Sequence, residues 1–237
     1  MYVEQYWSHS YIPVLIRLDG VVIDIGFYGG GFSARIAARC RRVVAFEPDP
    51  RCQGVPAGLT NVVVIPKAIG RNGGLRTLSV NSDKCSSFHH SDASSPKIEV
   101  ETMTFEDALR LVPSERIDLV KMDIEGEELA VLSNASASAF DRIVQLTVEF
   151  HDFLDPQSLP EIRSVIARME TLGFAALRFS WRNYGDILFV NRNLVRITQS
   201  DRLWMLARYK YVRGLVRLLR RHLFRRKTAY AASAGSW

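Results

Sequence analysis

Cysteine is scarce in this chain of 237 residues, which contains only Cys40, Cys52 and Cys85. Three widely separated thiols without a C-x-x-C pair argue against a disulfide framework and against a structural zinc site. Histidine is also sparse, and the pair His89 and His90 has no further ligand residues at supporting spacing. We therefore interpret that pair as part of a solvated loop and expect no metal.

Long hydrophobic runs are missing as well. No stretch of about 18 apolar residues occurs, so no membrane-spanning helix is expected. The first residues, MYVEQYWSHS, lack the basic region and apolar core of a signal peptide. The apolar share of 47% is ordinary for a globular chain, and the length suffices for one α/β domain with a substantial core. These features predict a protein of the reducing cytoplasm.

The most informative segment, residues 21–48, reads VVIDIGFYGGGFSARIAARCRRVVAFEP. The apolar run Val21–Ile25 predicts a strand buried on both faces, and the glycines after it predict a tight turn. A helical pattern over Phe32–Arg39 leads to a second strand, Val43–Phe46, which ends at Glu47. A carboxylate at that place can accept hydrogen bonds from the hydroxyl groups of a ribose, so this segment predicts a nucleotide pocket.

Asp24 bears on which nucleotide this pocket takes. The strand ends Asp24-Ile25-Gly26, and Gly30 follows four residues later, which is the D-x-G-x-x-x-G pattern of methyltransferases that use S-adenosylmethionine (SAM). A carboxylate near the turn suits the ammonium and sulfonium groups of SAM and would repel a diphosphate. The run that starts at Gly29 formally fits the dinucleotide pattern G-x-G-x-x-A, but it begins too far past the strand. An NAD-dependent dehydrogenase therefore stays the alternative for this pocket.

A second block, residues 117–132, reads IDLVKMDIEGEELAVL. It predicts a buried strand over Asp118–Met122, followed by a turn and a helix. Ligands of an open α/β sheet bind beyond the carboxyl ends of its strands. Asp123 and Glu125 are therefore expected at the same edge of the sheet as the carboxylates of the first block.

Three further charged residues belong to this block. Glu127 is interpreted as a helix-start residue whose charge complements the helix dipole, and for Glu128 both this interpretation and a functional one stay open. Lys121 is interpreted as a structural ion-pair partner of a nearby acid rather than as a catalytic group.

Several segments together resemble the FkbM-type methyltransferases. VIDIGFYGGGFSARIA, VVAFEP, IPKAIG, SSF, VKMDIEGEELAVL and TVEFHD occur in the order and spacing of that family between residues 21 and 151, and KMDIEGEE is the most specific of them. The resemblance implies a class I methyltransferase fold, SAM as the methyl donor, and O-methylation of a hydroxyl group on a sugar or a natural product.

By position, the resemblance assigns the glycine turn to SAM, Glu47 to its ribose and Ala68 to the neighbourhood of its adenine. Phe27 and Tyr28 replace small polar and aliphatic residues of the family, which is expected to change how the methionine end of SAM is held. Thr104 stands where the family often has Asp, which weakens any role for that strand end. The predicted cofactor-binding residues are Asp24, Gly26, Phe27, Tyr28, Gly30, Glu47, Ala68 and Asp123.

Alternating strands and helices are expected over the rest of the chain. Thr104 and Asp107 form a capping pattern at the start of a short helix that ends at residue 111. The whole pattern predicts a mostly parallel seven-stranded sheet with a closing antiparallel hairpin, in a domain of residues 1–200. Further strands are expected at residues 61–65, 75–80, 98–101, 143–150, 174–179 and 186–190, and a further helix at 159–172.

A hydroxyl acceptor is a poor nucleophile and gains from a general base. Glu149 and His151, in the segment TVEFHD, alternate along a strand end, so their side chains are expected on the same side. The ordinary pKa of a histidine suits a base, although His151 is equally interpreted as a surface residue at a strand end. Glu125 is the third candidate catalytic residue.

The net positive charge of the chain comes from its C-terminal end, a predicted tail of residues 201–237. Ten Lys and Arg residues and no acidic residue follow Asp201, so the net charge of +6 becomes −4 for residues 1–201. Within residues 210–225, basic side chains gather on one face of a predicted helix and apolar side chains on the other. This basic amphipathic helix is expected to lie on an anionic membrane surface or to pack on protein. Its apolar periodicity argues against binding of nucleic acid.

The sequence therefore predicts a SAM-dependent O-methyltransferase. Its partner is expected to be a hydroxylated small molecule or a glycan, such as a sugar, a glycolipid, a polysaccharide or a natural product. Membrane association through the tail would bring the enzyme to a lipid-linked glycan. An RNA methyltransferase that uses the basic tail on phosphates is the alternative, and the sequence carries no signal for an oligomeric state.

Overall fold

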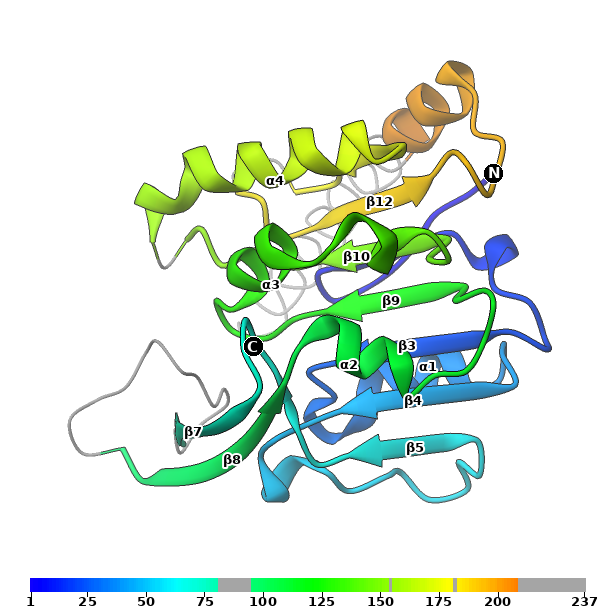
Figure 1. The fold of residues 1–237 in the computed structure, drawn as a ribbon. Helices are drawn as coiled ribbons and strands as arrows, with labels where there is room; N and C mark the ends of the chain where they lie inside the picture. Colours follow the sequence, from blue (N-terminus) through cyan, green and yellow to red (C-terminus); the bar gives the residue numbers. More distant parts are fainter. Residues whose placement is uncertain (81–94, 154, 181–182, 209–237) are drawn as a thin grey trace, which may run out of the picture. The chain divides into compact units, whose positions relative to one another are not determined.

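A seven-stranded sheet lies at the centre of the first of two compact units, Met1–Arg196 and Ile197–Trp237 (Figure 1). The computed structural model describes residues 1–80, 95–153, 155–180 and 183–208. In spatial order the strands of this sheet are β11 (Phe174–Arg178), β12 (Ile187–Asn191), β10 (Gln145–Val148), β9 (Leu119–Met122), β3 (Val21–Ile25), β4 (Arg42–Phe46) and β5 (Val62–Ile65).

Strand direction follows the predicted pattern. The neighbours β10 and β9, β9 and β3, β3 and β4, and β4 and β5 are parallel, whereas β12 is antiparallel to both β10 and β11. Every residue of β3, β9 and β10 is buried, as expected for parallel strands that are covered on both faces. The predicted α/β class, with a mostly parallel sheet and a closing hairpin, is confirmed.

Helices cover both faces of the sheet. Ile23 and Ile25 pack into one hydrophobic cluster together with residues of α2, α3 and α4, while Val22 packs into a second cluster with Phe32 and Ile36 of α1. Figure 1 shows α2, α3 and α4 in front of the sheet. The helices are α1 (Gly31–Ala37), α2 (Phe105–Arg110), α3 (Glu128–Asn134) and α4 (Leu159–Thr171), with 3-10 turns at Pro13–Leu15, Tyr28–Gly30, Pro50–Cys52, Ala137–Phe140 and Pro156–Ser158.

Two smaller sheets accompany the central one. β1 (Glu4–Tyr6) and β2 (His9–Tyr11) form an antiparallel hairpin, here called the N-terminal hairpin. β6 (Ala68–Ile69), β8 (Lys97–Met103) and β7 (Gly74–Ser79) form a three-stranded sheet. The sequence predicts β7 and β8 but not β1, β2 or β6, because strands of two or three residues are too short to show a periodic pattern.

The N-terminal hairpin is attached to the central sheet by a buried glutamine. The Gln145 side chain, on β10, accepts a hydrogen bond from the Ile12 N–H (2.8 Å) and donates one to the Ile12 carbonyl (3.1 Å). Tyr11 is fully buried in the cluster that contains Phe32. The hairpin therefore lies on the face of the sheet that α1 covers.

Residues 199–208 are helical and belong to the second unit. The predicted helix over residues 210–225 lies outside the described residues, as do Cys85, His89 and His90 and most of the polar loop around them. Among the described residues, no helix is both long enough and apolar enough to cross a membrane. The boundary after residue 200 stays a prediction.

Candidate active site

The carboxyl ends of four parallel strands meet at one edge of the sheet. Register pairs Ile25 with Phe46 and with Met122, and Met122 with Val148. The residue that follows each of these strand ends therefore lies at the same edge. These four residues are Gly26, Glu47, Asp123 and Glu149, all of which the sequence singles out as site residues.

The turn after β3 requires glycine for two physical reasons. Gly26 and Gly30 have φ values of +84° and +79°, which L side chains rarely adopt. A Cβ atom on Gly26 would also lie 1.8 Å from the carbonyl oxygen of Asp123. The turn after β3 is thus built directly against the turn after β9.

Phe27 and Tyr28 differ in their exposure. The Phe27 side chain is buried in the hydrophobic cluster that contains Phe32, and its ring lies against Gly30. Phe27 therefore packs against the protein side of the turn. Tyr28 is 54% exposed. Of the two departures from the family pattern, Tyr28 is the one whose ring can contact a ligand, and both cofactor assignments stay predictions.

Glu47 is buried at the end of β4 and organises the backbone around it. Its Oε2 accepts a hydrogen bond from the Tyr28 N–H (2.9 Å), and its Oε1 accepts one from the Asp49 N–H (2.9 Å). Burial raises the pKa of this carboxyl, and the two backbone hydrogen bonds oppose that shift. The remaining lone pairs of the carboxylate can accept hydrogen bonds from ribose hydroxyl groups, as predicted for an acid at this place.

Asp24 is fully buried and faces protein groups. Its Oδ2 accepts a hydrogen bond from the Ser33 hydroxyl on α1 (2.7 Å), and its Oδ1 lies 3.5 Å from the Lys121 ammonium. The cation beside Asp24 in the structure is therefore a lysine of the protein. Asp24 stays a predicted cofactor residue, but its contacts with Ser33 and Lys121 indicate that it stabilises the turn after β3.

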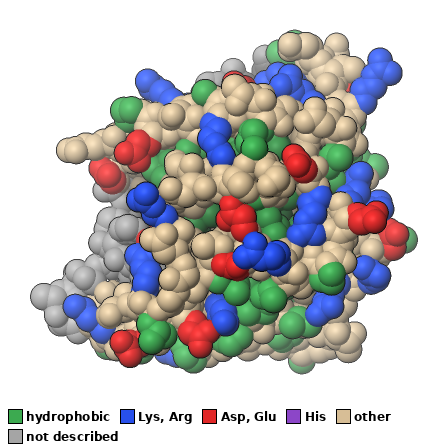
Figure 2. Space-filling view, in the orientation of Figure 1, with side chains coloured by type: hydrophobic (Ala, Val, Ile, Leu, Met, Phe, Trp, Pro, Cys, Tyr) green, Lys and Arg blue, Asp and Glu red, His purple; other side chains and the backbone are tan. Residues whose placement is uncertain are grey.

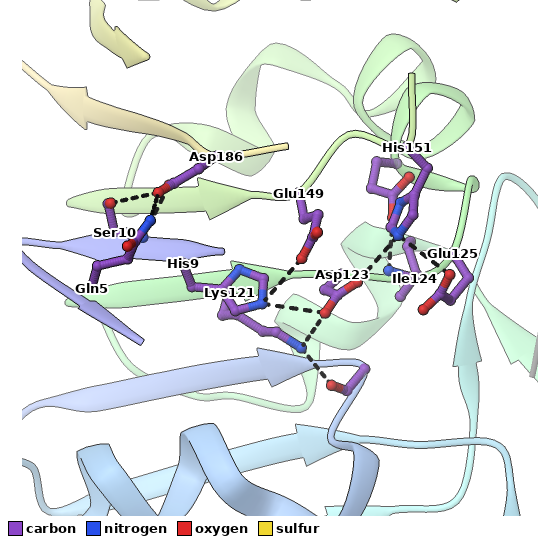
Figure 3. Close-up of polar contacts among 12 residues, drawn as sticks. Gln5, His9, Ser10, Lys121, Asp123, Ile124, Glu125, Glu149, His151 and Asp186 are labelled. Atoms are coloured by element: carbon purple, nitrogen blue, oxygen red, sulfur yellow. Dashed lines mark hydrogen bonds and ion pairs between the residues drawn. The ribbon is translucent and has the colours of Figure 1, made fainter. Parts of the chain in front are cut away.

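Asp123 is the centre of the polar cluster (Figure 3). Its Oδ2 lies 3.4 Å from the Lys121 ammonium and 3.2 Å from Nε2 of His9. Burial opposes ionisation, but Lys121, His9 and His151 outweigh it and hold the pKa of Asp123 well below its usual range. Lys121 is itself fixed by the Gly26 carbonyl, to which its ammonium donates a hydrogen bond of 2.5 Å. The expectation that Lys121 pairs with nearby acids is confirmed.

Glu149 and His151 both point toward Asp123 from the end of β10 (Figure 3). Oε2 of Glu149 lies 3.8 Å from Nε2 of His9, and Nε2 of His151 lies 3.7 Å from Oδ1 of Asp123. Burial, followed by the negative charge of Asp123, raises the pKa of Glu149 to about 7.

His151 sits among carboxylates. Its Nδ1 lies 3.1 Å from Oε1 of Glu128 and its Nε2 lies 3.3 Å from Oε2 of Glu125. Burial disfavours the imidazolium form, but Glu128, Glu125 and Asp123 outweigh that effect and raise the pKa of His151 to about 9. His151 is 6% exposed, so it is a residue of the interior cluster. The interpretation of His151 as a surface histidine is wrong.

Two members of the cluster have roles that the sequence does not reveal. Glu128 accepts hydrogen bonds from the N–H groups of Ile124 (2.8 Å) and Gly126 (3.1 Å), so it holds the turn after β9 in shape. His9 comes from the N-terminal hairpin, more than a hundred residues away from Asp123 in the sequence. Its aromatic, strand-forming neighbours Tyr6 and Tyr11 are the one local sign that His9 belongs to a hairpin rather than to a solvated end.

The hairpin that carries His9 is fixed by a buried carboxylate on the far side of the cluster. Asp186 accepts hydrogen bonds from the Ser10 N–H (3.1 Å), from the Ser10 hydroxyl (2.7 Å) and from the Gln5 amide. Figure 3 shows this contact beside the Asp123 cluster. Asp186 thus places His9 in the site.

A cavity of about 390 Å³ lies close to Glu47, beyond the ends of β4 and β5. Its lining includes Pro48, Asp49, Pro66 and Val80. Ala68 is buried against Leu78 and Val100, and it is not among the residues that line this cavity. Its predicted place near the adenine stays a prediction. A carboxylate that can accept from hydroxyl groups, together with a partly apolar cavity beside it, fits the ribose and the base of an adenosine-containing cofactor.

Comparison with known proteins finds solved structures of low similarity, among them the following three. The methyltransferase FkbM from Methylobacillus flagellatus is 17% identical (TM-score 0.47) and covers 73% of this chain, which spans 43% of that one. An rRNA methylase from Streptococcus thermophilus is 14% identical, with a TM-score of 0.43. A putative methyltransferase from Streptococcus mutans, solved in complex with SAH (the demethylated product of SAM), is 10% identical, with a TM-score of 0.41. Each match covers 75% of this chain and 88% of the other chain. All three TM-scores are below 0.5, so no argument rests on these structures. No curated protein matches the chain significantly.

The family model described as the methyltransferase FkbM domain matches residues 24–176, which is more than half of the chain. The match includes the turn after β3, Glu47, the turn after β9 and the strand end that carries Glu149 and His151. His9 lies outside it. The chain belongs to the FkbM methyltransferase family, and the cofactor that this family implies is SAM.

Proposed function

We propose that this protein is a SAM-dependent O-methyltransferase that acts on a hydroxyl group. The observation that carries the proposal is the convergence of Asp123, Glu149, His9 and His151 at the strand edge that also carries the glycine turn and Glu47. The predicted cofactor-binding residues and side chains able to accept a proton therefore lie along one edge of the sheet, which supports the proposal.

The cofactor, when bound, supplies a methyl group that is already activated by its sulfonium. The protein has to bind the two reactants and to orient them, and such positioning is worth several kcal/mol of the barrier, roughly 7–11 at best. Glu47 would hold the ribose hydroxyl groups. The turn after β3 would fix the methionine end, because Lys121 ties its backbone to Asp24 and Asp123.

Glu149 is the best placed general base. Oδ2 of Asp123 faces both Lys121 and His9, and Glu128 is occupied by backbone N–H groups and by His151. The ion-pair contact of Glu149 is 3.8 Å, the longest within the cluster, and its side chain is 19% exposed. Glu125 is more exposed (25%), but its oxygen lies closer to a histidine, 3.3 Å from Nε2 of His151, so we assign the role of base to Glu149.

The surroundings of the site suit a sugar ring or a similar hydroxylated molecule. Phe153 is 54% exposed, and its ring lies 5.4 Å from that of His151, which places an apolar face next to the polar groups. Binding sites for small molecules commonly combine such a face with a few polar groups that fix orientation. In Figure 2, basic and acidic side chains are interspersed over the face shown. The RNA alternative depends on the basic tail, most of which lies outside the described residues. We therefore favour a carbohydrate, glycolipid or natural-product acceptor.

Cofactor binding is tested first, by thermal unfolding in the presence of SAM, SAH, NAD or no ligand. A ligand at a hundred times its dissociation constant stabilises the fold by about 2.7 kcal/mol. A shift with SAM and SAH, and none with NAD, is expected. A shift with NAD alone would overturn the proposal and revive the dehydrogenase alternative.

Methyl transfer is tested with SAM labelled in its methyl group and a panel of mono- and oligosaccharides, glycolipids and polyhydroxylated natural products. Label on an oxygen atom of the acceptor is expected, and label only on RNA, or only on nitrogen or carbon, would contradict the proposal. Glu149→Gln should lower turnover by roughly 10²–10⁴-fold and leave SAH affinity unchanged. Glu161→Gln, an exposed acid on α4, is the matched control.

A further inference from the structure

A second function of the cluster is indicated by three atoms on one side of Asp123. Asp123, Glu125 and His151 each offer one ligand atom, and these three atoms all lie within 4.8 Å of one another. Nε2 of His151 is 3.3 Å from the Glu125 oxygen and 3.7 Å from the Asp123 oxygen. Ligand atoms placed tetrahedrally at about 2.1 Å from a cation are about 3.4 Å apart, so these separations match a coordination shell.

His151 is prepared to act as a metal ligand. Its Nδ1 lies 3.1 Å from Oε1 of Glu128, a carboxylate that is 1% exposed and is itself held by backbone N–H groups. Histidines that bind metals nearly always direct their second ring nitrogen to a carboxylate or carbonyl in this way. The other ring nitrogen, Nε2, is the one that lies near Asp123 and Glu125.

The charges around Asp123 also favour a cation on this side. The buried Lys121 ammonium lies 3.4 Å from Oδ2 of Asp123 and also pairs with Asp24. Its positive charge is therefore next to Oδ2 of Asp123, the oxygen away from His151. On the Oδ1 side, Asp123 meets Glu125 and His151. A bound cation would balance the negative charge of these two carboxylates.

A competing set of ligands exists on the other side. His9, Asp123 and Glu149 also offer one ligand atom each within 4.8 Å of one another, and Nε2 of His9 lies 3.2 Å from Oδ2 of Asp123. A cation there would sit next to the Lys121 ammonium, since both would share Oδ2 of Asp123. Repulsion between two buried cations makes that set the poorer site.

We propose that Oδ1 of Asp123, Oε2 of Glu125 and Nε2 of His151 bind a divalent transition-metal cation such as Mn²⁺ or Zn²⁺. Two carboxylate oxygens and one imidazole nitrogen suit these ions better than Ca²⁺, which prefers oxygen ligands alone. Three protein ligands leave coordination positions open for water or for an oxygen atom of an acceptor. The inference goes beyond the proposed function, because methyl transfer with Glu149 as the base does not require a metal.

The test uses the full chain, stripped of metal with EDTA and desalted. Binding of Mn²⁺ is followed by the electron paramagnetic resonance signal of the free ion, and binding of Zn²⁺ by calorimetry. About one cation per chain is expected. Glu125→Gln and His151→Ala should each lower the affinity at least about 10-fold, and so should Glu128→Gln, which removes the carboxylate that orients His151.

Controls separate this site from the competing one and from misfolding. Glu149→Gln and Glu161→Gln should bind Mn²⁺ like the wild type. Far-UV circular dichroism and the thermal shift with SAH show that each variant is folded, and they report on cofactor binding independently of the metal. Failure of the wild type to bind either ion at millimolar concentration would overturn the inference. Loss of binding in Glu149→Gln, with binding retained in Glu125→Gln, would also overturn it.

Discussion

The ammonium of Lys121 lies 3.5 Å from the carboxylate of Asp24, and both side chains are buried between β3 and β9. The sequence places Asp24 where a carboxylate suits the positive charge of SAM, and the structure places a protein cation there. The same ammonium lies 3.4 Å from Asp123 and donates a hydrogen bond to the carbonyl of Gly26. One lysine thus links the turn after β3 to the turn after β9, and so connects the predicted cofactor loop to the proposed catalytic residues.

Replacing Lys121 with Met should lower the free energy of unfolding by roughly 3–5 kcal/mol, because Asp24 and Asp123 would keep buried charges without their cation. Urea unfolding followed by circular dichroism measures this. Lys67→Met is the matched control: Lys67 pairs with Glu101 at 2.6 Å, but the two side chains are 36% and 60% exposed, so the expected loss is at most about 1 kcal/mol. Equal losses in the two variants would contradict a structural role for Lys121.

Thr104 should act through helix stability alone. Its hydroxyl accepts a hydrogen bond from the Asp107 N–H, and the Asp107 carboxylate accepts one from the Thr104 N–H, which completes a capping box at the start of α2. Thr104→Ala should cost about 1 kcal/mol of stability, whereas Thr104→Asp should cost less, because Asp also caps helices well. SAH affinity should not change in either variant. A loss of SAH affinity in Thr104→Ala would give this strand end a cofactor role.

Glu47→Gln should weaken binding of the cofactor. An amide cannot accept hydrogen bonds from the N–H groups of both Tyr28 and Asp49, and it loses the charge that favours ribose hydroxyl groups. A hydrogen bond to a charged group contributes about 1.5–3 kcal/mol, so SAH affinity should fall by roughly 10-fold or more, as measured by calorimetry. Unchanged affinity, with Glu161→Gln as the control, would remove Glu47 from the cofactor site.

The fold could be predicted from the sequence wherever a pattern is local and long enough. The seven strands of the central sheet are all predicted, because each is an apolar run between turn residues, and the cap at Thr104 is confirmed. Boundaries are less accurate: the strand predicted at residues 143–150 is Gln145–Val148. β1, β2 and β6 are not predicted, since two or three residues cannot display a period.

The site could be predicted only along the strand edge. Asp123 and Glu149 directly follow parallel strands, so their convergence follows from topology. His9 could not be found in this way, because an isolated histidine far from the other site residues carries no motif. The grouping of Asp123, Glu125 and His151 could not be found in this way either, because these residues come from two strand ends and their spacing in the chain resembles no metal motif.

The two described cysteines should differ in reactivity. Cys40 is buried, and burial raises the pKa of its thiol to about 11, so only about one thiol in a thousand is ionised at pH 8. Cys52 is partly exposed. Iodoacetamide at pH 8 should therefore modify Cys52 at least about 10-fold faster than Cys40 in the folded protein, as followed by peptide mass spectrometry. In urea the two rates should become similar, and equal rates in the folded state would show that Cys40 is accessible.

Asp186 should control the active site from a distance through the N-terminal hairpin. Its carboxylate holds Gln5 and Ser10, and the hairpin in turn directs His9 toward Asp123 and Glu149. Asp186→Ala should speed hydrogen exchange at residues 4–11 without affecting β3, because β1 and β2 pair only with each other while β3 is paired on both sides. Turnover should fall while SAH affinity stays unchanged, since the hairpin carries none of the predicted cofactor residues. His9→Asn should reproduce the loss of turnover without the faster exchange. Faster exchange in Asp186→Ala with normal turnover would mean that the hairpin anchors the fold but does not position His9 for catalysis.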